Sequence, residues 1–214
     1  MSTTENSKQR QRIYLTGVGG QGTLTATTLL ARTALMAGVP VIAGEVHGMA
    51  QRGGVVESVV LLGGWRAPKL DFGEADILLG FEPLESLRGL PYLRQGGVVF
   101  ASSDRLPPVG VSLGQATYPD QDHIVEAISK VAKLQYFFPC RELGREAGAV
   151  QSGNTVLLAA VCASGVLPFD ESDLEKTIRA TMPEKLQAVN LKAVEIGKSL
   201  VSKAGMLWRG ASKA

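Results

Sequence analysis

The residues with the clearest chemical meaning form a glycine-rich turn near the start of the chain: Gly17, Val18, Gly19, Gly20, Gln21 and Gly22. This turn follows a strand expected over 12–16 and precedes a helix expected over 23–37. Where such a turn leads into a helix, backbone N–H groups point at the ligand and the helix dipole favours negative charge. The pattern therefore predicts a site for an anionic, phosphate-bearing ligand.

Individual residues of the turn can contribute to binding an anionic ligand in different ways. Gly17 allows a tight turn, Gly19 allows close approach of a ligand, and Gly22 allows the helix to pack closely on the strand. Gln21 and Thr23 can donate further hydrogen bonds to a ligand. The alternative is that the glycines serve only the packing of the helix on the sheet, without any ligand.

A second stretch, 45–54, is dense in glycine and functional side chains and follows the end of a strand expected over 39–43. Arg52 can hold a phosphate or carboxylate, and Gln51 can donate to an acceptor group. His47 is one of two histidines in the chain and is a weaker candidate, because no second histidine or cysteine stands at a supporting distance. We expect this loop to lie where α/β proteins bind their ligands.

Glu45 raises a different hypothesis. In a dinucleotide-binding fold an acid at the end of the second strand binds the ribose hydroxyl groups. The sequence therefore also allows a free-standing oxidoreductase that binds a nicotinamide or flavin cofactor.

The order of elements predicts an α/β fold, with a Rossmann-like, largely parallel sheet and a C-terminal helical layer. Strands are expected over 12–16, 39–43, 55–62, 75–81, 97–102 and 134–138. Helices are expected over 23–37, 83–90, 122–134, 151–163, 171–180 and 184–201.

We predict one domain over 12–204, with an α/β part over 12–139 and a helical part over 140–204. Residues 1–11 are expected to be disordered, and 205–214 to form a C-terminal tail. The helix over 151–163 is apolar on nearly every face, so it is expected to be buried, in the core of this chain ahead of a contact with another subunit.

Composition narrows the range of partners. The 214 residues include 22 basic and 20 acidic side chains, a formal net charge of +2 without a basic block, which argues against nucleic acid or an anionic membrane as the main partner. No apolar stretch reaches the length of a membrane span, and we expect a cytoplasmic protein. The two cysteines, Cys140 and Cys162, cannot supply an iron–sulfur or structural zinc site by themselves.

No nucleophile elbow, P-loop lysine or metal-ligand cluster occurs, so no catalytic residue and no metal site are assigned. The sequence offers residues for binding without obvious residues for breaking bonds. That combination favours a subunit that positions a ligand or a partner.

Several stretches together resemble the gamma-type domain of 2-oxoacid:ferredoxin oxidoreductases. They are the glycine turn 17–22 (GVGGQG), the loop 45–54 (EVHGMAQRGG), the strand 55–62 (VVESVVLL), the stretch 75–88 (ADILLGFEPLESLR) and Asn154 in GNTVLLAA. The resemblance covers 12 to about 200. Within the family, the residue sequence of the loop 45–54 and the short length of the chain are most similar to those of the small (beta) subunits of the indolepyruvate type.

The resemblance implies a subunit that is inactive alone and supports the oxidative decarboxylation of an arylpyruvate with coenzyme A, passing electrons to ferredoxin. It implies a larger partner that carries thiamine diphosphate and iron–sulfur clusters, while coenzyme A contacts this chain. Candidate binding residues carried over are Gly17, Gly19, Gly20, Gln21, Gly22, Glu45, His47, Gln51, Arg52 and Ser58. A purely structural assembly subunit remains the alternative.

Overall fold

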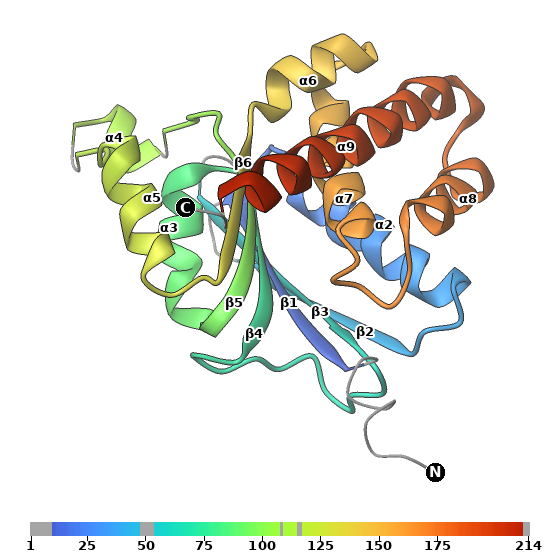
Figure 1. Ribbon diagram of the computed structural model, residues 1–214. Helices are drawn as coiled ribbons and strands as arrows, with labels where there is room; N and C mark the ends of the chain where they lie inside the picture. Colours follow the sequence, from blue (N-terminus) through green and yellow to red (C-terminus); the bar gives the residue numbers. More distant parts are fainter. Residues whose placement is uncertain (1–9, 48–53, 108, 115–116, 212–214) are drawn as a thin grey trace. The chain divides into compact units, whose positions relative to one another are not determined.

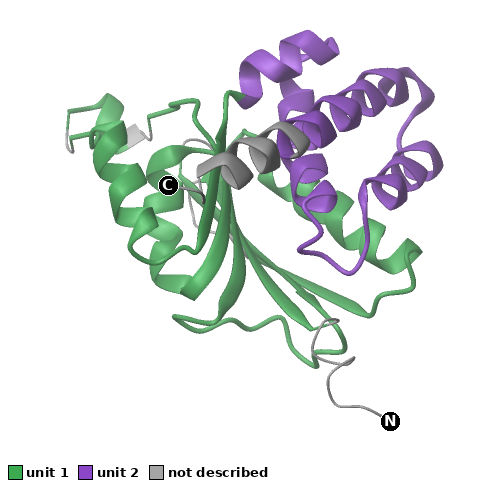
Figure 2. Cartoon of the chain, viewed as in Figure 1, with its two compact units in different colours: residues 1–139 green, residues 140–214 purple. Residues whose placement is uncertain are grey.

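The computed structural model describes residues 10–47, 54–107, 109–114 and 117–211. The chain falls into two compact units, Met1–Pro139 and Cys140–Ala214, which are coloured separately in Figure 2.

The first unit is built on a mixed sheet, which has six strands in the described part of the chain, in the order β2-β3-β1-β4-β5-β6. Strands β1, β4, β5 and β6 run parallel, whereas β3 lies antiparallel between β2 and β1. The strands are β1 (Gln11–Val18), β2 (Val41–His47), β3 (Val55–Leu62), β4 (Ala75–Gly80), β5 (Leu93–Ser102) and β6 (Leu134–Phe138). The predicted α/β fold with a mostly parallel sheet is confirmed.

Helices cover both faces of this sheet (Figure 1). Helix α2 (Thr23–Met36) packs on β1, β2 and β3, and helices α3 (Pro83–Gly89) and α5 (Gln121–Ser129) lie on the opposite face. A short 3₁₀ helix, η1 (Leu90–Tyr92), follows α3, and one turn of helix, α4 (Val109–Ser112), precedes α5.

Successive side chains of β1 point to opposite faces of the sheet, so each face has its own apolar core. Tyr14 faces α3 and α5 and packs with Leu78, Val99 and Ile124. Helix α3 approaches β1 so closely that a Cβ on Gly89 would lie 2.7 Å from the Tyr14 ring. This contact holds the end of α3 against β1.

The second unit is helical. It contains α6 (Cys140–Ala147), η2 (Val150–Ser152), α7 (Gly153–Ala163), α8 (Glu171–Thr181) and α9 (Glu184–Ala211). Helix α7 packs against α6, α8 and α9, and all its residues from Thr155 to Cys162 are buried. The expectation that this apolar helix is a buried core element is confirmed.

Several predicted boundaries were wrong. The helix expected over 122–134 ends at Ser129, because the chain then turns to pair with β5: Gly96 N–H donates to Val131 O, and Lys133 N–H donates to Gly97 O. Helix α9 continues to Ala211, ten residues past its predicted end at 201. Helix α6 was not predicted.

Candidate functional site

The carboxyl ends of β1 and β4 form a topological switch point. The chain leaves β1 into α2 on one face of the sheet and leaves β4 into α3 on the other face. In open α/β sheets, ligands bind outside the carboxyl ends of strands at such a point. The glycine turn lies at the end of β1, and Phe81 lies at the end of β4.

The backbone of the glycine turn requires glycine at two positions. Gly20 has φ +97°, and Gly22, which caps α2, has φ 84°; both lie in the left-handed region that other residues rarely adopt. Gly17 is needed for a different reason, because a Cβ there would lie 2.7 Å from Thr23 Oγ1. Around Gly20, by contrast, a Cβ would meet no atom of the described chain within 4 Å, so the turn is open on that side.

Gln21 uses its side chain inside the protein. Its Oε1 accepts a hydrogen bond of 2.7 Å from the Val18 N–H, and its Nε2 donates to the Phe81 carbonyl oxygen at 3.1 Å. The side chain thus joins the end of β1 to the end of β4 across the switch point. These two bonds indicate that Gln21 shapes the turn.

The two predicted loops meet through their backbones. The Gly19 N–H donates to the Gly54 carbonyl oxygen at 2.8 Å, next to the strand pair Val18 and Val55. The stretch that ends at Gly54 therefore joins the glycine turn directly. Gln51 and Arg52 lie outside the described residues, as does the side chain of His47, whose backbone ends β2.

Three buried hydroxyl groups near this end of the sheet have no hydrogen-bond partner within the described part of the chain. They are Thr16 Oγ1, on β1, Thr23 Oγ1, at the first residue of α2, and Ser58 Oγ, on β3. Thr23 is 2% exposed and Ser58 is fully buried. Leaving a buried hydroxyl unpaired costs about 1–3 kcal/mol, which is tolerable where a ligand supplies the partner.

Glu45 does not lie beside the glycine turn. It is exposed on β2, and β3 separates β2 from β1, so at a spacing of about 4.8 Å per strand Glu45 lies roughly 10 Å from the first strand. In a dinucleotide-binding fold the strand bearing the ribose-binding acid is the direct neighbour of the first strand. The strand order therefore disfavours the dinucleotide hypothesis.

Sequence reasoning missed Glu82, a fully buried carboxylate that follows β4. It caps α3 by accepting from the Glu85 N–H at 3.0 Å, and it accepts from the Tyr118 hydroxyl group at 2.5 Å. Burial raises the pKa of Tyr118, and the hydrogen bond to Glu82 raises it further. The signal available in the sequence was a capping acid before Pro83, at the carboxyl end of a strand.

A second polar group lies between the sheet and α3. Tyr14 donates to Glu57 Oε1 at 2.5 Å, and Arg88 pairs with the buried Glu85 at 2.7 Å. Burial raises the pKa of Glu85, and the charge of Glu82 adds to that increase while Arg88 opposes it. The first of these bonds joins β1 to β3, and the second lies within α3.

Neither cysteine is placed for chemistry. Both are buried, and burial raises the pKa of the Cys162 thiol, which makes the reactive thiolate scarce. Within the described ranges, no three His, Cys, Asp or Glu side chains gather in a group able to hold a metal ion. No helix in those ranges has the length and apolar character needed to cross a membrane.

Comparison with known proteins gives consistent matches across nearly the whole chain. The family model for pyruvate ferredoxin/flavodoxin oxidoreductase matches residues 12–200. The indolepyruvate oxidoreductase subunit IorB of Thermococcus kodakarensis is 42% identical over 190 residues, covering 86% of this chain and 93% of that protein.

Solved structures share the fold. The gamma subunit of a keto/oxoacid ferredoxin oxidoreductase from Geobacter sulfurreducens superposes with a TM-score of 0.65 at 23% identity, covering 91% of this chain and 99% of that one. The 2-oxoglutarate:ferredoxin oxidoreductase from Magnetococcus marinus, solved with 2-oxoglutarate, coenzyme A and succinyl-CoA, gives a TM-score of 0.66 at 19% identity, covering 91% of this chain and 31% of that one. The chain belongs to the pyruvate ferredoxin/flavodoxin oxidoreductase family.

Proposed function

We propose that this chain is the small subunit of an indolepyruvate (arylpyruvate):ferredoxin oxidoreductase, and that it binds coenzyme A at its glycine turn. The observation that carries the enzyme assignment is the 42% identity to IorB over 93% of that subunit's length. Identity of this degree over a whole subunit supports a shared reaction as well as a shared fold.

The geometry of the turn supports an anionic ligand such as coenzyme A. The first N–H groups of α2 have no acceptor inside the helix, since its hydrogen-bond ladder begins with Ala26 N–H donating to Gly22 O. A Cβ on Gly20 would meet no described atom within 4 Å, and the buried hydroxyl group of Thr23 stands at the same helix start without a partner in the described chain. The Magnetococcus marinus enzyme, which shares the fold, has coenzyme A bound.

The remaining chemistry belongs on a larger partner subunit. Two buried cysteines cannot hold an iron–sulfur cluster, and the sequence lacks the Gly-Asp-Gly signature of a thiamine diphosphate site. We therefore propose that the partner supplies thiamine diphosphate and the clusters, and that the complex passes electrons to ferredoxin. The complex is expected to work in the cytoplasm, where coenzyme A and ferredoxin are available.

Two other functions predict different results. A dinucleotide-binding oxidoreductase would place its second strand, which carries the ribose-binding acid, directly beside β1, but β3 lies between β2 and β1. A purely structural subunit would need the glycine turn only for packing, yet a Cβ on Gly20 would meet no described atom within 4 Å, so packing against the described chain does not require glycine there. Both observations favour ligand binding at the turn.

The test is anaerobic viologen reduction with indolepyruvate and coenzyme A, using the large partner subunit with and without this chain. Activity that requires both chains is the expected result. Full coenzyme A-dependent activity from the large subunit alone would contradict the proposal, and turnover of another oxoacid but not indolepyruvate would remove the arylpyruvate assignment.

A second measurement separates coenzyme A binding from assembly. Gly20→Ala forces a side chain onto a backbone at φ +97° without a clash with any described atom, so the turn must reshape while the core stays packed. We expect the coenzyme A concentration for half-maximal rate to rise while the two chains still co-purify. An unchanged requirement in an intact complex would support a purely structural turn.

A further inference from the structure

The carboxylate of Glu82 joins three segments just beyond the end of β4. Its side chain is fully buried. Oε2 accepts from the Glu85 N–H at 3.0 Å, while Oε1 accepts from the Leu106 N–H at 3.2 Å and from the Tyr118 hydroxyl group at 2.5 Å. Hydrogen bonds to a charged, buried acceptor are among the stronger ones in proteins, so these contacts hold the carboxylate in one orientation.

The same residue is linked to the glycine turn through its neighbour Phe81. The Phe81 N–H donates to Thr16 O at 2.9 Å, at the end of β1, and the Phe81 carbonyl oxygen accepts from Gln21 Nε2 at 3.1 Å. Anchoring Glu82 therefore anchors the peptide from which the Gln21 side chain is held. A continuous path of bonds connects Tyr118 to the glycine turn.

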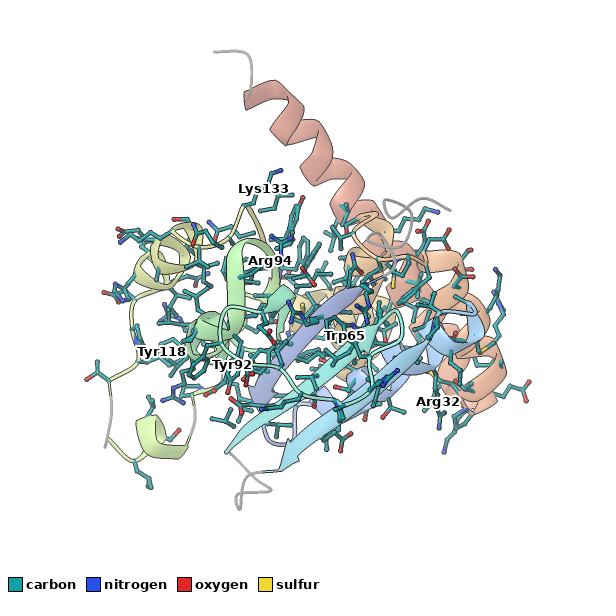
Figure 3. The ribbon with its side chains drawn as sticks, turned by 90° about the horizontal axis from the view of Figure 1, so that it is seen from below. Arg32, Trp65, Tyr92, Arg94, Tyr118 and Lys133 are labelled. Carbon is teal, nitrogen blue, oxygen red and sulfur yellow. The ribbon has the colours of Figure 1, made fainter. Side chains whose placement is uncertain are left out.

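The other two partners of Glu82 lie in the connection from β5 to α5. We call residues 103–107 the first arm and residues 117–120 the second arm. Leu106 belongs to the first arm and Tyr118, labelled in Figure 3, belongs to the second. The guanidinium group of Arg105 lies over the Tyr118 ring at 5.1 Å, so the arms also contact each other.

Strand direction places the first arm at the same edge of the sheet as the glycine turn. Strands β1, β4 and β5 are parallel, so the chain leaves all three at their carboxyl ends. The first arm begins there, where the Ser103 N–H donates to Phe138 O at 2.8 Å. Glu82 thus fixes the first arm at the edge that binds ligands in α/β proteins.

We propose that Glu82 is a positioning residue for coenzyme A, which holds the glycine turn through Phe81 and holds the two arms through Leu106 and Tyr118. The inference rests on the proposed function, because it assumes that the turn binds this ligand. Such coupling is reciprocal. Contacts that hold the two arms in place raise the affinity for coenzyme A, and bound coenzyme A in turn stabilises the arms.

The first variant for testing this is Tyr118→Phe, which removes one hydrogen-bond donor to Glu82 and keeps the ring beneath Arg105. In the assembled two-subunit enzyme we expect the coenzyme A concentration for half-maximal viologen reduction to rise about tenfold, a typical effect of losing a hydrogen bond to a charged group. The rate at saturating coenzyme A should stay within about twofold of wild type, since the chemistry takes place on the partner.

Substitutions of Glu82 itself test the acceptor side of the same hydrogen bonds. Glu82→Ala removes every acceptor, whereas Glu82→Gln keeps one oxygen of similar placement. We expect the coenzyme A requirement of Glu82→Gln to lie between those of wild type and Glu82→Ala. The control is Tyr92→Phe, because Tyr92 stacks on Tyr14 at 4.4 Å and the donors to Glu82 are Glu85, Leu106 and Tyr118, so the requirement should stay unchanged.

Hydrogen exchange of the Leu106 amide reports on the first arm directly. Pro107 and Pro108 follow it and carry no amide hydrogen, so a peptide covering this segment gives a clear signal. Exchange should speed up in Tyr118→Phe, and coenzyme A should slow it in wild type. Faster exchange with an unchanged coenzyme A requirement would make Glu82 purely structural and would overturn the inference.

The Gly20→Ala variant separates failure of the inference from failure of the proposed function. If Gly20→Ala raises the coenzyme A requirement while the Glu82 and Tyr118 variants do not, the turn binds coenzyme A and the positioning role is wrong. If none of these variants moves the requirement, both the ligand assignment and the positioning role are wrong.

Discussion

The N–H of Gly19 donates a hydrogen bond of 2.8 Å to the carbonyl oxygen of Gly54, although the two residues are 35 positions apart in the sequence. One lies in the turn after β1 and the other lies directly before β3. Because β1 and β3 pair in antiparallel register from this point onward, the end of one strand and the start of the other form a single edge. The glycine turn and Gly54, the last residue of the second predicted loop, are therefore neighbours at this edge.

The Gln21 side chain is expected to stabilise this site. Gln21→Leu would leave the Val18 N–H and the Phe81 carbonyl oxygen without their side-chain partners. The free energy of unfolding should fall by about 2–4 kcal/mol, measured by urea denaturation. Gln95→Leu is the control, since Gln95 is exposed and makes a single bond to Lys130 O, and it should change stability by less than about 0.5 kcal/mol.

Thr23→Val tests whether the unpaired hydroxyl group serves a ligand. Valine has nearly the same shape and a similar helix propensity, so stability should stay unchanged or rise by up to about 1 kcal/mol. The coenzyme A requirement of the assembled enzyme should nevertheless rise several-fold. A requirement equal to that of wild type would remove Thr23 from the site.

Thr33→Val on the same helix is the matched control for Thr23. The Thr33 hydroxyl group donates to Leu29 O at 2.9 Å, so its removal should lower the free energy of unfolding by about 1 kcal/mol. The coenzyme A requirement should not change. Opposite patterns in stability and ligand dependence would distinguish a binding hydroxyl group from a structural one.

Glu85→Gln is expected to show a particular dependence on pH. Burial raises the pKa of Glu85 above its usual 4.5, so the folded state favours the neutral form. That contribution to stability is fully present below 4.5 and is lost as the pH rises through the raised pKa. Glutamine stays neutral, so the stability of Glu85→Gln relative to wild type should increase as the pH rises from 4.5 to 8, in urea denaturation.

Glu126, an exposed carboxylate, is expected to show the opposite dependence of stability on pH. The hydrogen bond from Lys130 lowers the pKa of Glu126, so its contribution is present above the usual value and is lost on acidification. The stability of Glu126→Gln relative to wild type should therefore fall slightly as the pH rises. If the stability of Glu85→Gln relative to wild type did not change with pH over the same range, Glu85 would not be a buried carboxyl group for which the folded state favours the neutral form.

Gly197→Ala tests the packing of α7 on α9. A Cβ on Gly197 would lie 2.3 Å from Val156 O and 2.7 Å from Ala159 Cβ, so the helices would have to move apart. The free energy of unfolding should fall by about 1–3 kcal/mol, even though alanine favours helix. Glu195→Ala, at an exposed position of α9, should have an effect below about 0.5 kcal/mol, and equal effects of the two variants would contradict close packing here.

Local signals in the sequence were sufficient for the strand, glycine turn and helix at the start of the chain. The left-handed conformations fall on Gly20 and Gly22, within the turn that the glycine pattern predicted. The apolar character of α7 likewise predicted its burial, because a helix that is apolar on every face has no side to expose. Helix α6 was missed because it is short and polar and contains Gly144, which is there to let η2 and α7 approach.

Strand order and side-chain burial were decided by the tertiary structure. The insertion of β3 between β2 and β1, which separates Glu45 from the turn, follows from pairing between distant segments. Glu82 becomes a buried acceptor only because Leu106 and Tyr118, 24 and 36 residues further along, fold back onto it. The sequence by itself determined the family and the two loops, since these depend on local residue patterns. Which of their side chains face a ligand and which hold the fold together depends on long-range contacts that no local pattern encodes.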